Sequence, residues 1–209
     1  MIAGRREVQM ENLYPVAMEA YLISAGVVAL AEIGDKTQLL AFVLAARYRR
    51  PWPIIAGIFA ATIVNHAIAG AVGAWLVHLL GPATLRWILA LSFFAMAGWI
   101  LVPDKLDEAD AAPVGRFGLF GTTVVTFFLA EIGDKTQIAT MALAAKYASF
   151  YWVVAGTTTG LMIADVPAVL IGDRLAGRLP TRSVHAIAAV IFAALGVIVL
   201  LGSADRLLG

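Results

Sequence analysis

The octapeptide Ala-Glu-Ile-Gly-Asp-Lys-Thr-Gln occurs twice in this chain, at 31–38 and at 130–137, each time inside a long apolar stretch. An ionisable side chain at the centre of a bilayer costs about 2.5 to 3.5 kcal/mol, so six isolated charges would disfavour insertion by roughly 15 to 20 kcal/mol. We therefore expect the charged groups of both copies to meet in one interior site. They are Glu32, Asp35, Lys36, Glu131, Asp134 and Lys135.

The composition is that of a membrane protein. Hydrophobic residues make up 61% of the 209 residues, charged residues 14%, and the mean hydropathy is +0.88, whereas the apolar content of soluble domains is nearer one half. Six apolar segments each reach the roughly 20 residues that a helix needs to cross a bilayer. The predicted fold class is an all-α integral membrane protein with six transmembrane helices, at about 15–46, 53–80, 83–102, 117–148, 150–176 and 182–203.

The charge balance and the residue types present restrict the partners. A net charge of +1 gives no bulk attraction to nucleic acid, so we expect a lipid bilayer and no nucleic acid around this chain. The sequence contains no cysteine, which removes thiolate ligands. A bound metal ion would have to be held by oxygen or nitrogen.

The two halves of the chain are internal repeats. Adding 99 to a residue number carries 44–48 onto 143–147 and Gly57 onto Gly156, as well as one octapeptide onto the other. Three helices per half is an odd number, so the second half would enter the membrane from the opposite side and form an inverted pair, as in many transporters. The predicted parts are a polar N-terminal tail (1–14), repeat 1 with three helices (15–102), an acidic cytosolic linker (103–116) and repeat 2 with three helices (117–209).

The orientation follows from the Lys and Arg residues near the helix ends. Eight lie on the side that holds the central linker and five on the other, which places the linker in the cytosol and both termini outside. The eight are Arg47, Arg49, Arg50, Lys105, Arg116, Arg174, Arg178 and Arg182, and the five are Arg5, Arg6, Arg86, Lys146 and Arg206.

The spacing within each octapeptide directs its carboxylates to one side. In a helix, Glu32 and Asp35 lie on one face and Gln38 continues it, and the second copy repeats the pattern. Gly34 and Gly133 stand between the carboxylates, where a missing side chain lets the backbone loosen and expose carbonyl oxygens. We expect the two motif helices, the first and the fourth, to be kinked or broken at mid-membrane.

Bringing the two copies together would surround one point with oxygen atoms. Four carboxylates, two hydroxyls and two amides suit a hard divalent ion: Ca²⁺ takes six to eight oxygens and Mn²⁺ accepts octahedral oxygen sites, whereas zinc and copper more often recruit imidazole or thiolate. The predicted metal ligands are Glu32, Asp35, Glu131, Asp134, Thr37, Thr136, Gln38 and Gln137.

The charge sum of this site predicts exchange. Four carboxylates and two ammonium groups give minus two, which one divalent cation or two protons would neutralise. We hypothesise that ion and protons compete for the same carboxylates, with Lys36 and Lys135 as fixed counter-charges. The alternative is an intrahelical Glu-to-Lys pair that balances each copy by itself, and two identical copies make that alternative less favoured.

Other polar residues lie within the apolar segments. Asp165 is costly in such a segment, so we expect it to line the ion pathway, with Pro167 supplying a local helix break that frees carbonyl groups. Asn65 is a weaker candidate for the pathway. The neighbouring His66, which the offset of 99 carries onto Asp165, is interpreted as a hydrogen-bonded packing residue.

Two copies of Glu-x-Gly-Asp-Lys-Thr, at 32–37 and 131–136, resemble the family of small membrane cation/proton exchangers that includes Golgi calcium/manganese transporters and bacterial manganese exporters. The resemblance covers nearly the whole chain. It implies Mn²⁺ or Ca²⁺ as transported substrate, protons as counter-ion, and neither a cofactor nor an enzymatic reaction. The compact form resembles the bacterial branch, which implies manganese efflux across a bacterial inner membrane, with the termini then periplasmic. That family often carries Asn where this chain has Asp165, a difference that bears on ion selectivity.

Two other functions remain alternatives. Export of a basic amino acid would use the same carboxylates to hold an ammonium or guanidinium group, but it needs a larger cavity with apolar or aromatic walls, and small residues surround the motif. A metal-dependent hydrolase acting on a lipid-linked phosphate is less favoured, because the sequence offers neither its nucleophile motif nor a cluster of arginines within the membrane.

Overall fold

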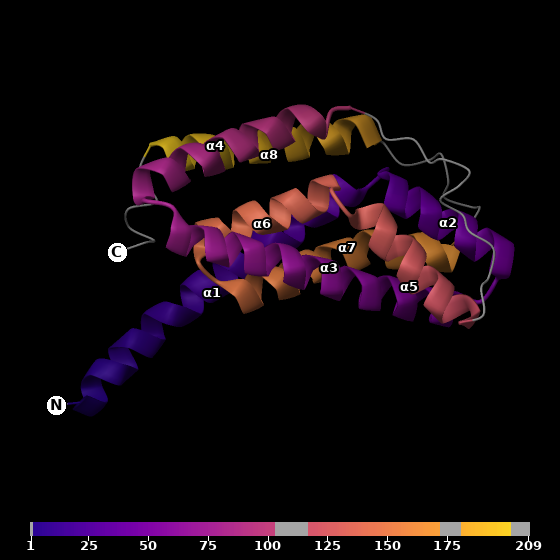
Figure 1. The fold of residues 1–209 in the computed structure, drawn as a ribbon, viewed down its shortest axis with the longest axis horizontal. Coiled ribbons are helices and arrows are strands. Elements are labelled where there is room, and N and C mark those ends of the chain that lie inside the picture. The colour runs from indigo at the N-terminus through magenta and orange to yellow at the C-terminus, as the bar shows by residue number, and fades with distance from the viewer. Residues whose placement is uncertain (1, 103–116, 172–180, 202–209) are drawn as a thin grey trace.

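The computed structural model of the chain describes residues 2–102, 117–171 and 181–201, and the predicted linker 103–116 lies outside them. The described residues form helices and short turns, with no strand among them, which confirms the all-α class (Figure 1). The helices in chain order are α1 (Ile2–Glu32), α2 (Lys36–Tyr48), α3 (Pro51–Leu79), α4 (Pro82–Trp99), α5 (Gly118–Glu131), α6 (Lys135–Tyr147), α7 (Phe150–Ile171) and α8 (Thr181–Leu200).

Within the described residues, four helical stretches are long and apolar enough to cross a membrane by themselves. They are Tyr14–Glu32, Pro51–Leu79, Phe150–Ile171 and Arg182–Leu200. The two apolar motif segments, expected at 15–46 and 117–148 with a kink or break inside each, consist of two helices each, α1 with α2 and α5 with α6.

Both motif helices are broken at the glycine of the octapeptide. Gly34 has a φ of 84° and Gly133 a φ of 75°, in the left-handed region that a residue with a Cβ rarely adopts. The next residue is the N-cap of the following helix in both copies, with φ −78° and ψ 168° at Asp35 and φ −76° and ψ 166° at Asp134. The predicted break in each motif helix is therefore confirmed.

Contacts between the halves are reciprocal. Helix α1 packs on α7 and α5 packs on α3, while α2 meets α7 and α6 meets α3. A Cβ at Gly57 on α3 would lie 2.7 Å from the Cβ of Thr123 on α5, and a Cβ at Gly156 on α7 would lie 2.5 Å from the carbonyl oxygen of Tyr21 on α1. Two glycines 99 residues apart thus permit a close approach between the halves, of α3 to α5 and of α7 to α1.

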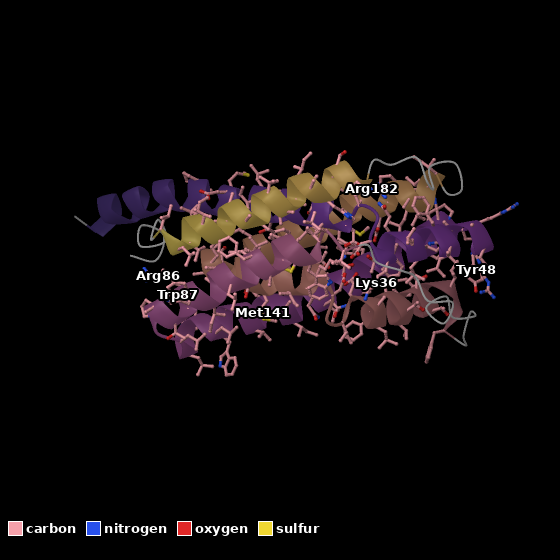
Figure 2. All side chains as sticks on the ribbon, turned by 90° about the horizontal axis from the view of Figure 1, so that it is seen from above. Lys36, Tyr48, Arg86, Trp87, Met141 and Arg182 are labelled. Atoms are coloured by element: carbon pink, nitrogen blue, oxygen red, sulfur yellow. The ribbon has the colours of Figure 1, made fainter. Side chains whose placement is uncertain are left out.

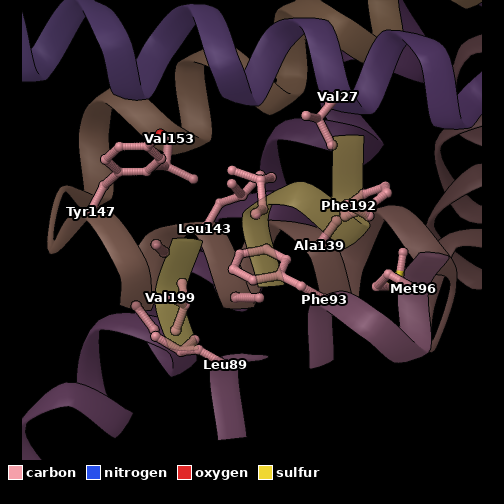
Figure 3. Packing of buried hydrophobic residues seen from close by; sticks show 14 of the residues in the cluster. Val27, Leu89, Phe93, Met96, Ala139, Leu143, Tyr147, Val153, Phe192 and Val199 are labelled. Atoms are coloured by element: carbon pink, nitrogen blue, oxygen red, sulfur yellow. The ribbon is translucent and has the colours of Figure 1, made fainter. Parts of the chain in front are cut away.

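Helices α4 and α8 break this equivalence. They pair with each other, with the rings of Phe93 and Phe192 6.4 Å apart, and they contact α6 and α1 respectively. Figure 1 shows the pair as a layer over α6 and α1. Figure 3 shows the buried cluster beneath it, where Val27 and Leu143 face these two phenylalanines.

Helix α7 runs without interruption from Phe150 to Ile171. The break predicted at Pro167 is wrong: the proline lies inside a continuous helix that packs against α1, α2 and α3. The missing N–H of Pro167 still leaves the carbonyl of Ile163, four residues earlier, without its usual helical donor.

Candidate metal centre

Three carboxylates from both halves meet at the two breaks. Glu32 is the last residue of α1, while Asp35 and Asp134 are the N-caps of α2 and α6. One oxygen of each lies within 4.8 Å of the others, and the three side chains are at most 3% exposed. Figure 2 shows the neighbouring Lys36 near the middle of the bundle, well away from Tyr48, which lies at one end of the molecule.

The two lysines cross between the copies. Lys135 places its Nζ 3.0 Å from Oδ1 of Asp35, and both side chains are 1% exposed. Lys36 reaches Oδ1 of Asp134 at 4.0 Å and is 28% exposed. Each lysine therefore pairs with the aspartate of the other half, which argues against copies that balance their charge independently.

The fourth predicted carboxylate, Glu131, lies outside this group of three. It accepts hydrogen bonds from the Thr62 hydroxyl at 2.8 Å and from Nδ2 of Asn65 at 3.1 Å, both on α3. Glu32 instead accepts a hydrogen bond from Thr37 of its own motif, and its Oε2 is buried with no hydrogen-bond partner in the described residues. The group of carboxylates is thus less symmetric than the sequence predicted, because hydrogen bonds from helix α3 hold Glu131 apart.

The glutamine amides bond to the backbone at the two breaks. Oε1 of Gln38 accepts the N–H of Gly34, and Oε1 of Gln137 accepts the N–H of Gly133, each at 2.8 Å. Nε2 of Gln38 donates to the carbonyl of Ala164 at 3.0 Å. These bonds fix the turns beside the carboxylates, and direct binding of an ion by the glutamines stays a prediction.

Thr136 differs from its counterpart in the first copy. Its Oγ1 is buried and has no hydrogen-bond partner in the described part of the chain. An unbonded buried hydroxyl beside Lys135 is available as a further oxygen ligand.

Asn65 and Asp165 both lie next to the motifs, and their role in the ion pathway stays a prediction. Asn65 bonds Glu131 and also accepts from Nε2 of Gln137 at 3.4 Å. Asp165 follows the Ala164 carbonyl that Gln38 holds, and it is fully buried, with neither oxygen hydrogen-bonded in the described residues. A buried carboxylate of this kind calls for a cation or a proton.

The expectation for His66 is wrong. It is fully buried, but neither ring nitrogen has a hydrogen-bond partner in the residues that the structure describes. The hydrogen bond expected at this ring is therefore not seen, while its burial agrees with a packing role.

Sequence reasoning did not predict two contacts at this site, those of Thr62 and His185. Thr62 lies three and four residues before Asn65 and His66, so a polar stripe on one helix face would have revealed it. His185 of α8 has its Nε2 2.6 Å from the carbonyl oxygen of Ile33, inside the first break. An isolated histidine in an apolar segment was the available signal for this contact.

The buried carboxylates, the lysine counter-charges and the unbonded Thr136 hydroxyl form a group rich in oxygen and without thiolate, the kind of group that hard cations prefer. The sequence profile of the family described as "Divalent cation/proton antiporter GDT1" matches residues 20–108 and 119–206. The chain belongs to this family. The two matched segments begin 99 residues apart, the offset that relates the two octapeptides. Membership confirms the resemblance and makes the protein a membrane transporter, not an enzyme.

Relatives within the GDT1 family come from bacteria and eukaryotes. A Vibrio cholerae protein whose name proposes manganese export is 51% identical over 84% of this chain and 87% of its own length. A GDT1-like protein of Synechocystis is 29% identical over 84% of this chain and 93% of its own length. The yeast divalent cation/proton antiporter GDT1 is 25% identical over 89% of this chain and 85% of its own length. No solved structure matches this chain.

Proposed function

We propose that this chain exports Mn²⁺ from the cytosol in exchange for protons, with Ca²⁺ as a second cargo. The observation that carries the proposal is the buried group of Glu32, Asp35 and Asp134, drawn from both octapeptides. The name of the Vibrio cholerae relative supports manganese as the cargo and export as the direction. The positive-inside count supports a cytosolic central linker and periplasmic termini in a bacterial inner membrane.

The transported ion occupies the space between the three carboxylates, and Thr136 adds a neutral oxygen. Glu131 and Asp165 complete the acidic surroundings, and Lys135 and Lys36 offset part of their charge. Either the cation or protons compensate the remaining negative charge, so that the empty, fully charged site is disfavoured. This competition couples the two fluxes.

The two halves act as an inverted repeat that rocks around the site. The reciprocal contacts of α1 with α7 and of α5 with α3 support this arrangement. In it, α1 with α2 and α5 with α6 each cross the membrane as one broken span, and the breaks lie at mid-depth. Six crossings result, in agreement with the apolar segments of the sequence.

The test uses purified protein reconstituted in vesicles with a pH gradient. We expect Mn²⁺ flux, and a smaller Ca²⁺ flux, to depend on the gradient and to stop when a protonophore removes it. Glu32→Gln and Glu131→Gln should each abolish flux, since each removes a negative charge from the centre. Glu19→Gln makes the same chemical change about 20 Å further along α1 and serves as the matched control.

Intact Mn²⁺ and Ca²⁺ flux in both glutamate variants would overturn the proposed mechanism. Gradient-driven lysine transport without Mn²⁺ transport would instead favour the basic amino acid as cargo. Mg²⁺ is included because it prefers to keep its water shell. We expect it to be transported poorly by a site built from protein oxygens.

A further inference from the structure

Helix α8 contacts the first break through one polar side chain. The Nε2 atom of His185 lies 2.6 Å from the carbonyl oxygen of Ile33, and His185 is only 9% exposed. A carbonyl oxygen can only accept, so Nε2 carries the proton and donates it. Ile33 directly follows the end of α1, where carbonyl groups lack helical partners and need a donor from elsewhere.

Within the described residues, the second break has no equivalent of the His185 contact. Ile132, the counterpart of Ile33, has a side chain that is 53% exposed. The counterpart of His185 is Arg86, which Figure 2 shows at the end of the bundle, away from Lys36 and the breaks. In the α4 and α8 pair, α8 contacts α1, which ends at the first break, whereas α4 contacts α6 (Figure 1).

We propose that His185 is a positioning residue of the ion site. Its hydrogen bond to Ile33 holds the turn that joins Glu32 to Asp35 and keeps these two carboxylates at the spacing that the cation needs. Among the described residues, no side chain of another helix donates to the carbonyl of Ile132, and the turn at Gly133 is the half of the site that moves during exchange. This inference rests on the proposed cation transport, because it assigns His185 a role in that same site.

The first test measures Mn²⁺ itself, by flux and by binding to the purified full-length protein. His185→Leu removes the donor and keeps the bulk. We expect the apparent affinity for Mn²⁺ to fall by about tenfold or more, as for other groups that orient metal ligands, while the maximal rate changes little. His185→Gln places an amide N–H near the position of Nε2 and should restore the affinity. Arg86→Leu is the matched control and should leave the affinity unchanged.

The second test needs no transport. The natural chain contains no cysteine, so Ile33→Cys and Ile132→Cys each provide a single thiol at equivalent positions of the two breaks. We expect a maleimide to label the thiol at 132 quickly and the thiol at 33 slowly. Adding His185→Leu should speed labelling at 33 and leave labelling at 132 as it was.

The outcomes separate this inference from the proposed function. If the parent protein transports Mn²⁺ and His185→Leu leaves both the Mn²⁺ affinity and the labelling at 33 unchanged, His185 has no positioning role. An affinity loss that His185→Gln fails to recover would also overturn it. If the parent moves no divalent cation at all, the proposed function fails, whatever the labelling shows.

Discussion

The two octapeptides are identical in sequence and nearly identical in backbone, yet they are not equivalent in the molecule. Both break the helix at a glycine with positive φ, and both close the turn with a 2.8 Å bond from that glycine to the glutamine. The first turn is covered by His185 of α8, whereas Ile132 in the second is 53% exposed. Eight residues determine the turn, and the helices packed around it determine its surroundings.

The charged groups of the two copies are also unequal, but here the groups of the second copy are the more tightly held. Glu32 joins Asp35 and Asp134 in the group of three, whereas Glu131 is held by α3. Lys135 is buried at 3.0 Å from its partner, while Lys36 is partly exposed at 4.0 Å. A repeated sequence thus makes a site whose two halves differ in their contacts, with the turn held by α8 in the first copy and the glutamate held by α3 in the second.

We expect the largest difference in stability between the variants of the two lysines. Lys135→Met removes the ammonium next to the buried Asp35, and breaking a buried pair in this way costs about 3 to 5 kcal/mol. Lys36→Met loses a longer and partly solvated pair, worth about 1 kcal/mol or less. Thermal unfolding in detergent measures both. Equal destabilisation would mean that the two pairs are equivalent after all.

The threonines give the next largest contrast. Thr37 donates to Glu32, whereas the Thr136 hydroxyl has no partner in the described residues. Thr37→Val should lower the apparent Mn²⁺ affinity by about tenfold, because it releases a carboxylate of the group. Thr136→Val should cost less, since it removes one neutral oxygen. Flux at graded Mn²⁺ concentrations distinguishes them, and a larger loss at Thr136 would identify it as the stronger ligand.

Asp165 and His66 occupy equivalent positions in the two halves and differ in charge. Asp165→Asn keeps the shape of the side chain but removes a negative charge. This change should reduce Ca²⁺ transport more than Mn²⁺ transport, because Ca²⁺ needs more oxygen ligands. We expect transport to persist and the ratio of Mn²⁺ to Ca²⁺ flux to rise by about fivefold to tenfold, roughly 1 to 1.4 kcal/mol. His66→Asn changes no negative charge and should leave the ratio as it is; an unchanged ratio in Asp165→Asn would remove that residue from the pathway.

The smallest contrast lies at the far ends of the second motif helices. The Tyr147 hydroxyl donates to Glu19 at 3.2 Å, whereas the Tyr48 hydroxyl is buried without a hydrogen-bond partner in the described residues. Tyr147→Phe should lower the free energy of unfolding by about 0.5 to 1.5 kcal/mol. Tyr48→Phe should be neutral or slightly stabilising, because it removes an unsatisfied hydroxyl. Denaturant unfolding compares the two, and an equal loss would contradict the difference in bonding.

Local features of this protein could be predicted from its sequence. The offset of 99 identified the repeats, the apolar segments indicated a membrane protein, and the twin motifs identified the family. The helix breaks followed from Gly34 and Gly133, because a glycine flanked by an N-cap residue fixes its turn through neighbours only a few positions away. Pro167 shows the limit of such local reasoning, since α7 is continuous there despite the proline.

The tertiary structure decided which groups meet. Nothing in the spacing of the motifs distinguished Glu32 from Glu131, because the difference comes from Thr62 and Asn65 on another helix. The crossing of the lysines and the approach of His185 likewise depend on how α3, α6 and α8 pack. A sequence repeat specifies equal local geometry, but contacts between distant segments depend on the shapes of whole helices, and the off-centre α4 and α8 pair makes those contacts unequal.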